Sequence, residues 1–359
     1  MSKRIMQLDG LRAVAIIAVF LRHALDIRML WMGVDIFFVL SGFLITGILL
    51  DMQKDNFKSF IAQFYARRVR RIVPPYLLLL LVASLVFGVY WMQHWYMFIG
   101  LTNYVGYFYK DRQLPAFSPL WSLGVEEQFY IVWPLAVFFL KPKRLPALLV
   151  AMIIAAPLLR GVLTPWTDHV PWNASRWFVY KSTPFRMDCL ATGALITFLW
   201  RSHSEKIKKY GYLALILTIL TPPLMIYLNK YHPGFSTADG TIRGNVITLE
   251  ISLLAATGVF LWALGGRYTW ILSTPPMLFL GRISYSFYLI HDGMLVLAER
   301  YLHQRYVIAV IAFAGSTLYA TLSWYLMEKP LLHGGNRRVK AAEVEAALPT
   351  HTAVEAHSK

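Results

Sequence analysis

The stretch "LDGLRAVAIIAVFLRHALDI", residues 8–27, is apolar over a length that can cross a membrane, yet it carries several ionisable side chains. These are Asp9, Arg12, Arg22, His23 and Asp26. A spanning helix needs roughly 20 mostly apolar residues, and one charge at its centre costs about 2.5–3.5 kcal/mol on insertion scales. We therefore expect the ionisable side chains of this helix to face the interior of a bundle and to serve a function.

The rest of the chain has the same apolar character. Of its 359 residues, 57% are hydrophobic and only 15% are charged, whereas soluble domains have about 25% charged residues. The sequence predicts an all-α, polytopic membrane helix bundle of about ten transmembrane helices. The expected spans are residues 10–27, 33–50, 73–92, 119–140, 146–163, 184–200, 211–228, 245–264, 283–300 and 306–326.

Three segments between or after these spans have other patterns. Residues 57–73 place apolar and basic side chains at helical spacing, which predicts an amphipathic helix lying on a membrane face. Residues 94–109 are aromatic but interrupted by glycines, which favours an interfacial or re-entrant segment. Residues 334–359 have no apolar periodicity, so we expect a disordered tail behind one membrane domain, residues 1–333. Prolines such as Pro74–Pro75 and Pro275–Pro276 are expected where helices begin or end.

The positions of Lys and Arg predict the orientation. With the N-terminus inside, about 22 of the 35 basic residues lie on the cytoplasmic side and about nine on the other. Both termini are therefore expected in the cytoplasm. The net charge of +16 is then explained by topology, and we expect no nucleic-acid partner. A single cysteine, Cys189, excludes a disulfide framework, and no metal is expected because no metal-binding spacing such as HExxH occurs.

Arg12 and His23 are eleven residues apart on the first span. Eleven helical steps return to within about 20° of the start and rise about 16–17 Å, so both side chains point the same way at different depths. Arg12 is expected near the cytoplasmic side and His23 deeper. The alternative is that Arg12 only extends to the interface and that His23 is satisfied by a neighbouring helix.

Two carboxylates are candidates to assist His23. Asp35 begins the second span, and a short connection should bring it to the depth of His23, where it would orient the ring. Glu126, in "SPLWSLGVEEQFYIVWP", should lie about 10 Å into the fourth span. Its neighbour Glu127 lies about 100° around the helix, so we expect only one of the two to face the interior. Helix capping and structural hydrogen bonding remain open as alternatives.

Further polar side chains fall in the sixth and ninth spans. Arg186 and Asp188 are expected to form an internal ion pair that holds helices together. Ser284, Tyr288 and His291 recur at a spacing of three to four residues and so share roughly one helix face. A supporting role in the site and a purely structural role both remain open for these residues.

The inward-facing charges form two layers. Arg67, Arg68 and Arg71 join Arg12 on the cytoplasmic side, where they could bind phosphates. His23 and the carboxylates lie deeper, where they could transfer protons. This arrangement predicts a long, thin ligand that enters from the cytoplasm.

Seven collinear pieces of the sequence resemble the acyltransferase 3 family of bacterial membrane proteins. They are "LDGLRAVAIIAVFLRH", "GVDIFFVLSGFLIT", "FYARRVRRIVPPY", "LWSLGVEEQFYIVWP", "TPFRMDCLATGAL", "GRISYSFYLIH" and "MEKP". The resemblance covers residues 6 to 333 and includes an Arg-x10-His pair, which is Arg12 and His23 here.

The resemblance implies an enzyme of the bacterial inner membrane with about ten spans. It would move an acetyl or other short acyl group from cytoplasmic acyl-CoA to a hydroxyl of a glycan or glycolipid. It also implies that Arg12 and His23 are essential. Some family members carry a fused SGNH domain. We expect none here, because the sequence ends soon after "MEKP", so the protein would complete the transfer itself or pass the acyl group to a partner.

Combining the two arguments, we expect Arg67, Arg68 and Arg71 to bind the phosphates of CoA while its pantetheine arm brings the thioester to His23, which acts as general base. Tyr288 or Ser284 would donate hydrogen bonds to the oxyanion. A transporter or flippase with a proton relay, and a membrane scaffold, are the alternatives. The acceptor, the acyl chain length and the oligomeric state remain open.

Overall fold

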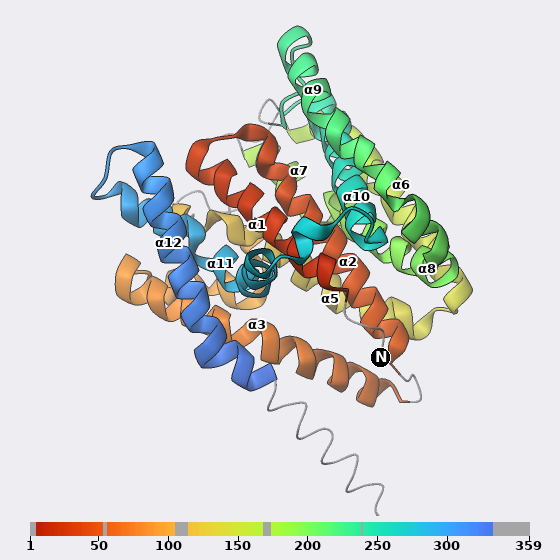
Figure 1. Cartoon of the computed structure of the whole chain (residues 1–359), viewed down its shortest axis with the longest axis horizontal. Coiled ribbons are helices and arrows are strands. Elements are labelled where there is room, and N and C mark those ends of the chain that lie inside the picture. The colour runs from red at the N-terminus through yellow and green to blue at the C-terminus, as the bar shows by residue number, and fades with distance from the viewer. Residues whose placement is uncertain (1–4, 53–55, 105–113, 168–173, 238–239, 333–359) are drawn as a thin grey trace, which may run out of the picture.

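The computed structural model describes residues 5–52, 56–104, 114–167, 174–237 and 240–332. Within these ranges every regular element is a helix, as predicted (Figure 1). The predicted tail, residues 334–359, lies outside the described residues. The α-helices are α1 (Met6–Leu25), α2 (Gly33–Asp51), α3 (Phe57–Phe87), α5 (Trp121–Phe139), α6 (Leu145–Thr167), α7 (Ala174–Lys181), α8 (Met187–Tyr210), α9 (Leu215–Tyr231), α10 (Leu249–Gly265), α11 (Pro275–Glu299) and α12 (Arg305–Ser323).

Six helical segments are long and apolar enough to cross a membrane: Arg28–Asp51, Phe57–Phe87, Pro142–Pro165, Met187–Tyr231, Arg243–Gly265 and Arg305–Leu332. These support a multi-pass membrane protein. The segment Met187–Tyr231 contains two of the predicted spans, so the number of crossings stays a prediction, as does the side on which the termini lie. The helices α1, α5 and α11 are not among the six, and these three contain Arg12, His23, Glu126 and His291.

Prolines act differently at two helix positions. Pro275 and Pro276 begin α11, as predicted, and occupy the first turn, where an N–H would have no partner within the helix. Pro74 and Pro75 lie inside α3, which continues from the basic segment into the apolar one. The predicted division at residue 73 is therefore wrong. The proline φ angle is helical, so the helix can continue at the loss of two backbone hydrogen bonds.

The helices that carry the site are packed at backbone distance. A Cβ atom placed on Gly281 of α11 would lie 1.8 Å from the Asp9 carbonyl oxygen of α1, so only glycine fits there. On the other side of the bundle, a Cβ on Gly42 of α2 would lie 1.9 Å from the Leu190 carbonyl oxygen of α8. Figure 1 shows α1, α2 and α11 at the centre, with α6, α8, α9 and α10 on one side and α3 and α12 on the other.

Candidate active site

A cavity of about 1160 Å³ lies between α1, α2, α3, α5, α8, α11 and the segment that follows α12. The end at which α1 begins, here called the basic end, is lined by cations from several helices. They include Arg12, Arg68, Arg71, Arg201, Lys208 and Arg282. At the opposite end the lining side chains are Val34, Phe37, Ser122 and Tyr288. The shape agrees with the prediction of a long ligand that enters beside the basic residues.

The cations of the basic end differ in their partners. Arg12 Nη1 donates to Asp9 Oδ1 at 2.7 Å, and Arg201 is paired with Asp51. Among the described residues, Arg68, Arg71 and Arg282 have no carboxylate within 4.0 Å, although all three border the cavity. These three guanidinium groups are therefore available to bind an anion.

The predicted phosphate-binding arginines separate into two groups. Arg68 and Arg71 line the cavity, whereas Arg67 is exposed and does not. Arg68 is held over the rings of Phe64 and Tyr130, with its guanidinium carbon 6.0 and 5.8 Å from the ring centroids. The geometry thus keeps Arg68 and Arg71 as candidates and leaves Arg67 outside the site.

Glu126 faces the cavity from α5. Its Oε2 accepts a hydrogen bond of 2.9 Å from the Tyr130 hydroxyl, which also bonds the Ser41 hydroxyl. Glu127 borders the same cavity. The prediction that only one of these glutamates faces the interior is therefore wrong, because the cavity is wide enough at α5 to meet two adjacent helix positions.

Tyr288 and Ser122 form a wall at the end of the cavity. The Tyr288 hydroxyl lies 2.6 Å from Ser122 Oγ and donates to the Pro119 carbonyl oxygen at 2.7 Å. The Tyr288 ring contacts Phe37 on the cavity side, with centroids 6.0 Å apart, and His291, with centroids 5.4 Å apart. His23 is not one of the described residues that line the cavity. The expectation that the cavity itself reaches His23 is therefore wrong, because the Tyr288 and Ser122 side chains separate the two.

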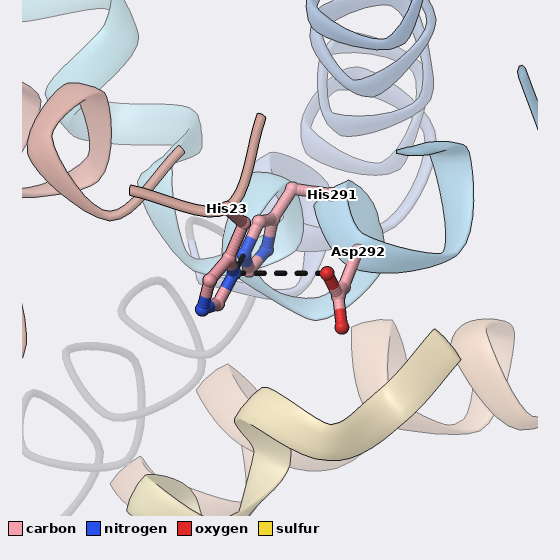
Figure 2. A group of neighbouring side chains, drawn as sticks. All are labelled: His23, His291 and Asp292. Carbon is pink, nitrogen blue, oxygen red and sulfur yellow. Dashed lines mark hydrogen bonds and ion pairs between the residues drawn. The ribbon is translucent and has the colours of Figure 1, made fainter. Parts of the chain in front are cut away.

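Beyond the wall, His23 of α1 meets His291 and Asp292 of α11 (Figure 2). His23 Nδ1 lies 2.9 Å from His291 Nε2 and 3.7 Å from Asp292 Oδ1. The two ring planes are nearly parallel, with an interplanar angle of 5° and centroids 5.1 Å apart, so the facing nitrogens meet edge to edge. One ligand atom from each of these residues lies within 4.8 Å of the others, so the group is close enough together to bind a metal ion. The hydrogen bond between the rings already satisfies the two facing nitrogens.

The partners predicted for Asp35 and Asp188 are wrong. Asp35 accepts hydrogen bonds from Arg186 and from Ser252, not from His23. Asp188 pairs with Arg160 Nη1 at 2.8 Å rather than with Arg186. The close approach of α2 and α8 explains the first change, because it places the start of α2 opposite the start of α8. These buried pairs join α2, α6, α8 and α10.

The predicted face of Ser284, Tyr288 and His291 is divided by the wall. Ser284 and Tyr288 border the cavity, and His291 lies behind Tyr288. The Ser284 hydroxyl donates to the Gly281 carbonyl oxygen at 2.9 Å. Sequence reasoning missed Asp292, Arg282 and Arg160. The adjacency of Asp292 to His291 in "YLIHDG" was the signal that could have identified it.

Comparison with known proteins indicates the family to which the chain belongs. A family model for an acyltransferase domain matches residues 5–328. The peptidoglycan O-acetyltransferase OatA of Listeria monocytogenes is 28% identical over 376 residues, covering 93% of this chain and 56% of that protein. The O-acetyltransferase OatA of Staphylococcus aureus is 27% identical over 354 residues, covering 91% of this chain and 57% of that protein. The chain thus spans a little over half the length of these relatives. No solved structure matches it.

The family match extends from the residue before α1 to the last residue of the π-helical turn that follows α12, Trp324–Glu328. It therefore includes the cavity, the Tyr288 wall and the histidine pair. On this match, which agrees with the resemblance of the sequence motifs, the chain belongs to the acyltransferase 3 family.

Proposed function

We propose that this protein is an O-acyltransferase of the bacterial plasma membrane that moves an acetyl or other short acyl group from acyl-CoA to a hydroxyl of a glycan or glycolipid. The observation that carries the proposal is the cavity. Three guanidinium groups at its basic end, those of Arg68, Arg71 and Arg282, have no carboxylate partner in the described part of the chain, and the histidine pair lies directly behind the wall at its other end. The names of the relatives, which are O-acetyltransferases, support the reaction class.

The donor binds from the basic end, which we place in the cytoplasm. The phosphates of CoA contact Arg68, Arg71 and Arg282, because one guanidinium group can donate two parallel hydrogen bonds to phosphate oxygens. Arg12 lines the same basic end and is fixed by Asp9. The pantetheine arm then extends towards Tyr288 and brings the thioester to the wall.

Transfer requires the Tyr288 side chain to turn, which joins the cavity to the space beside His23. His23 then takes the proton of the acceptor hydroxyl, and the hydroxyl oxygen attacks the thioester carbonyl. The C–S bond breaks, an ester forms, and CoA leaves as a thiol after it receives the proton from His23. The Tyr288 hydroxyl, once released from Pro119, is placed to donate to the developing oxyanion.

Asp35, Glu126, Arg186 and Asp188 have different roles in this proposal. Glu126 lies on the cavity wall and contacts the donor arm or a bound water. The pairs formed by Asp35 with Arg186 and by Asp188 with Arg160 hold the helices in position. Removing one partner from such a buried pair costs about 3–5 kcal/mol, so loss of activity in these variants would follow from loss of the fold.

The direct test uses the purified full chain in nanodiscs with radiolabelled acetyl-CoA and a peptidoglycan-derived glycan as acceptor. The wild-type protein should release CoA and label the glycan, whereas His23→Ala and Arg12→Ala should reduce labelling by about 10²-fold or more. His303→Ala is the matched control, because His303 is an exposed residue between α11 and α12. Wild-type labelling in both site variants would refute the assignment of these residues.

A further inference from the structure

His291 is fully buried behind Tyr288, and it takes no part in the bond changes of the proposed transfer reaction. We propose that His291 is a positioning residue that fixes His23 in the tautomer with its proton on Nδ1, so that Nε2 is the atom that accepts the proton of the acceptor hydroxyl. The inference rests on the proposed function and deepens it, because it names the reacting atom of the base and the group that prepares it.

The backbone of α11 fixes the tautomer of His291. Its Nδ1 lies 2.7 Å from the Tyr288 carbonyl oxygen. A carbonyl oxygen only accepts hydrogen bonds, so Nδ1 of His291 must carry a proton. In a neutral imidazole the second nitrogen then has a lone pair and no proton. His291 Nε2 is therefore an acceptor, and the backbone of α11 sets this state.

The tautomer of His291 in turn fixes the tautomer of His23. His291 Nε2 lies 2.9 Å from His23 Nδ1, a normal hydrogen-bond distance. Since Nε2 of His291 accepts, Nδ1 of His23 must donate. The neutral His23 ring then has its free lone pair on Nε2. Figure 2 shows this second nitrogen of His23 on the side of the ring away from His291 and Asp292.

Exposure separates the roles of the two rings. The His23 side chain is 31% exposed, whereas His291 is 0% exposed. An acceptor can therefore reach His23 but not His291. In catalytic systems of this kind, the group that bonds the inner nitrogen of the base holds its tautomer and orientation. Here a buried neutral imidazole occupies the position that a carboxylate occupies in a Ser-His-Asp triad.

Asp292 completes the arrangement. Its Oδ1 is 3.7 Å from His23 Nδ1, beyond hydrogen-bond distance but close enough for electrostatic attraction. When His23 Nε2 takes the hydroxyl proton, the ring becomes positive, and the carboxylate stabilises that charge. The proton then leaves from Nε2 to the CoA sulfur, so His291 keeps the same proton throughout.

The test compares two substitutions at position 291. His291→Phe fills a similar volume but cannot accept a hydrogen bond from His23 Nδ1, whereas the side-chain oxygen of His291→Gln can. We expect His291→Phe to lower kcat about 10²-fold with the KM for acetyl-CoA unchanged, and His291→Gln to recover kcat to within about tenfold of wild type. His94→Phe is the control, because it removes a buried histidine outside the cavity lining. Equal kcat values for His291→Phe and wild type would overturn the inference while leaving the proposed function intact.

A spectroscopic readout tests the tautomer without turnover. In ¹⁵N-histidine-labelled full chain, His23 should carry its proton on Nδ1 in the wild type and His291→Gln, and shift towards Nε2 protonation in His291→Phe. Protonation of His23 Nε2 in the wild type would overturn the inference even if the enzyme is active. Loss of activity after chelator treatment, with recovery on adding zinc chloride, would also overturn it, because a metal would then occupy the facing nitrogens.

Discussion

Arg67 and Arg68 are adjacent in the sequence and have the same side chain, but they lie in different surroundings. Arg68 lines the cavity and lies over two aromatic rings, whereas Arg67 is exposed outside it. If the cavity binds acyl-CoA through its phosphates, Arg68→Ala should weaken donor binding, and Arg67→Ala should leave it nearly unchanged. The pair therefore provides an internal control for charge, helix position and expression.

The magnitude follows from the kind of contact. A hydrogen bond to a charged group contributes about 1.5–3 kcal/mol, and about 1.4 kcal/mol corresponds to a factor of ten in binding. Arg68→Ala should therefore raise the KM for acetyl-CoA by about 10- to 100-fold. Arg68→Lys should lie between, because lysine keeps the charge but loses the planar fork. Arg67→Ala should change KM by less than about twofold, as expected for an exposed charge.

The assay measures the initial rate of thiol release against acetyl-CoA concentration with the acceptor at saturation. The same series with S-acetylpantetheine, which lacks the phosphates of CoA, tests the cause. Its KM should be high in all variants and insensitive to Arg68→Ala. The melting temperature of each variant controls for loss of the contacts with Phe64 and Tyr130. Equal effects of the two alanine substitutions, or an equal loss with acetylpantetheine, would refute the phosphate assignment.

Two further predictions concern stability, each with a matched control. Asp35→Asn weakens the buried pair with Arg186 and should destabilise the protein by about 3–5 kcal/mol. Asp51→Asn weakens the half-exposed pair with Arg201 and should cost less than about 1 kcal/mol. The melting temperatures of the two variants in nanodiscs are compared, and equal shifts would show that Asp35 is not structural. Gly281→Ala should force α1 and α11 apart and destabilise the protein by about 1–3 kcal/mol. At Gly161 an added Cβ atom would lie 3.8 Å from its nearest neighbour, so Gly161→Ala should be tolerated and is the control. An unchanged melting temperature for Gly281→Ala would contradict the close packing of the two helices.

Sequence periodicity predicted the parts of this protein that depend on one helix. The apolar runs predicted most of the helices, and residue type and depth placed Glu126, Arg68 and Arg71 at the site, although the same reasoning wrongly included Arg67 and wrongly left out one of the two glutamates. These predictions succeed because a helix fixes the relative directions of its own side chains. The continuity of α3 through Pro74 was missed, since the same residue can begin a helix or lie inside one when its φ angle fits.

The partners across helices could not be read from the sequence. Asp35 and Arg186 are separated by 151 positions, and their contact depends on the way α2 packs against α8. The sequence predicted that His23 contacts Asp35, because the two are near in the chain. In the structure His23 contacts His291 instead, because α1 and α11 approach at backbone distance. Helix register and crossing geometry, which single-helix periodicity does not contain, decide these choices.

The charges of the first helix follow from its place in the bundle. α1 lies at the centre (Figure 1), and its buried residues occur around the whole helix, from Leu8 and Leu11 to Val19 and Ala24. Two of its polar side chains have partners inside the bundle: Arg12 pairs with Asp9 of the same helix at the cavity, and His23 meets His291 of α11. The cost of burying them falls because each has a partner. The helices α1, α5 and α11, which carry Arg12, His23, Glu126 and His291, are all outside the six apolar spans, as is the short α7. Reduced apolarity in a central helix of this chain is thus itself a signal for the site.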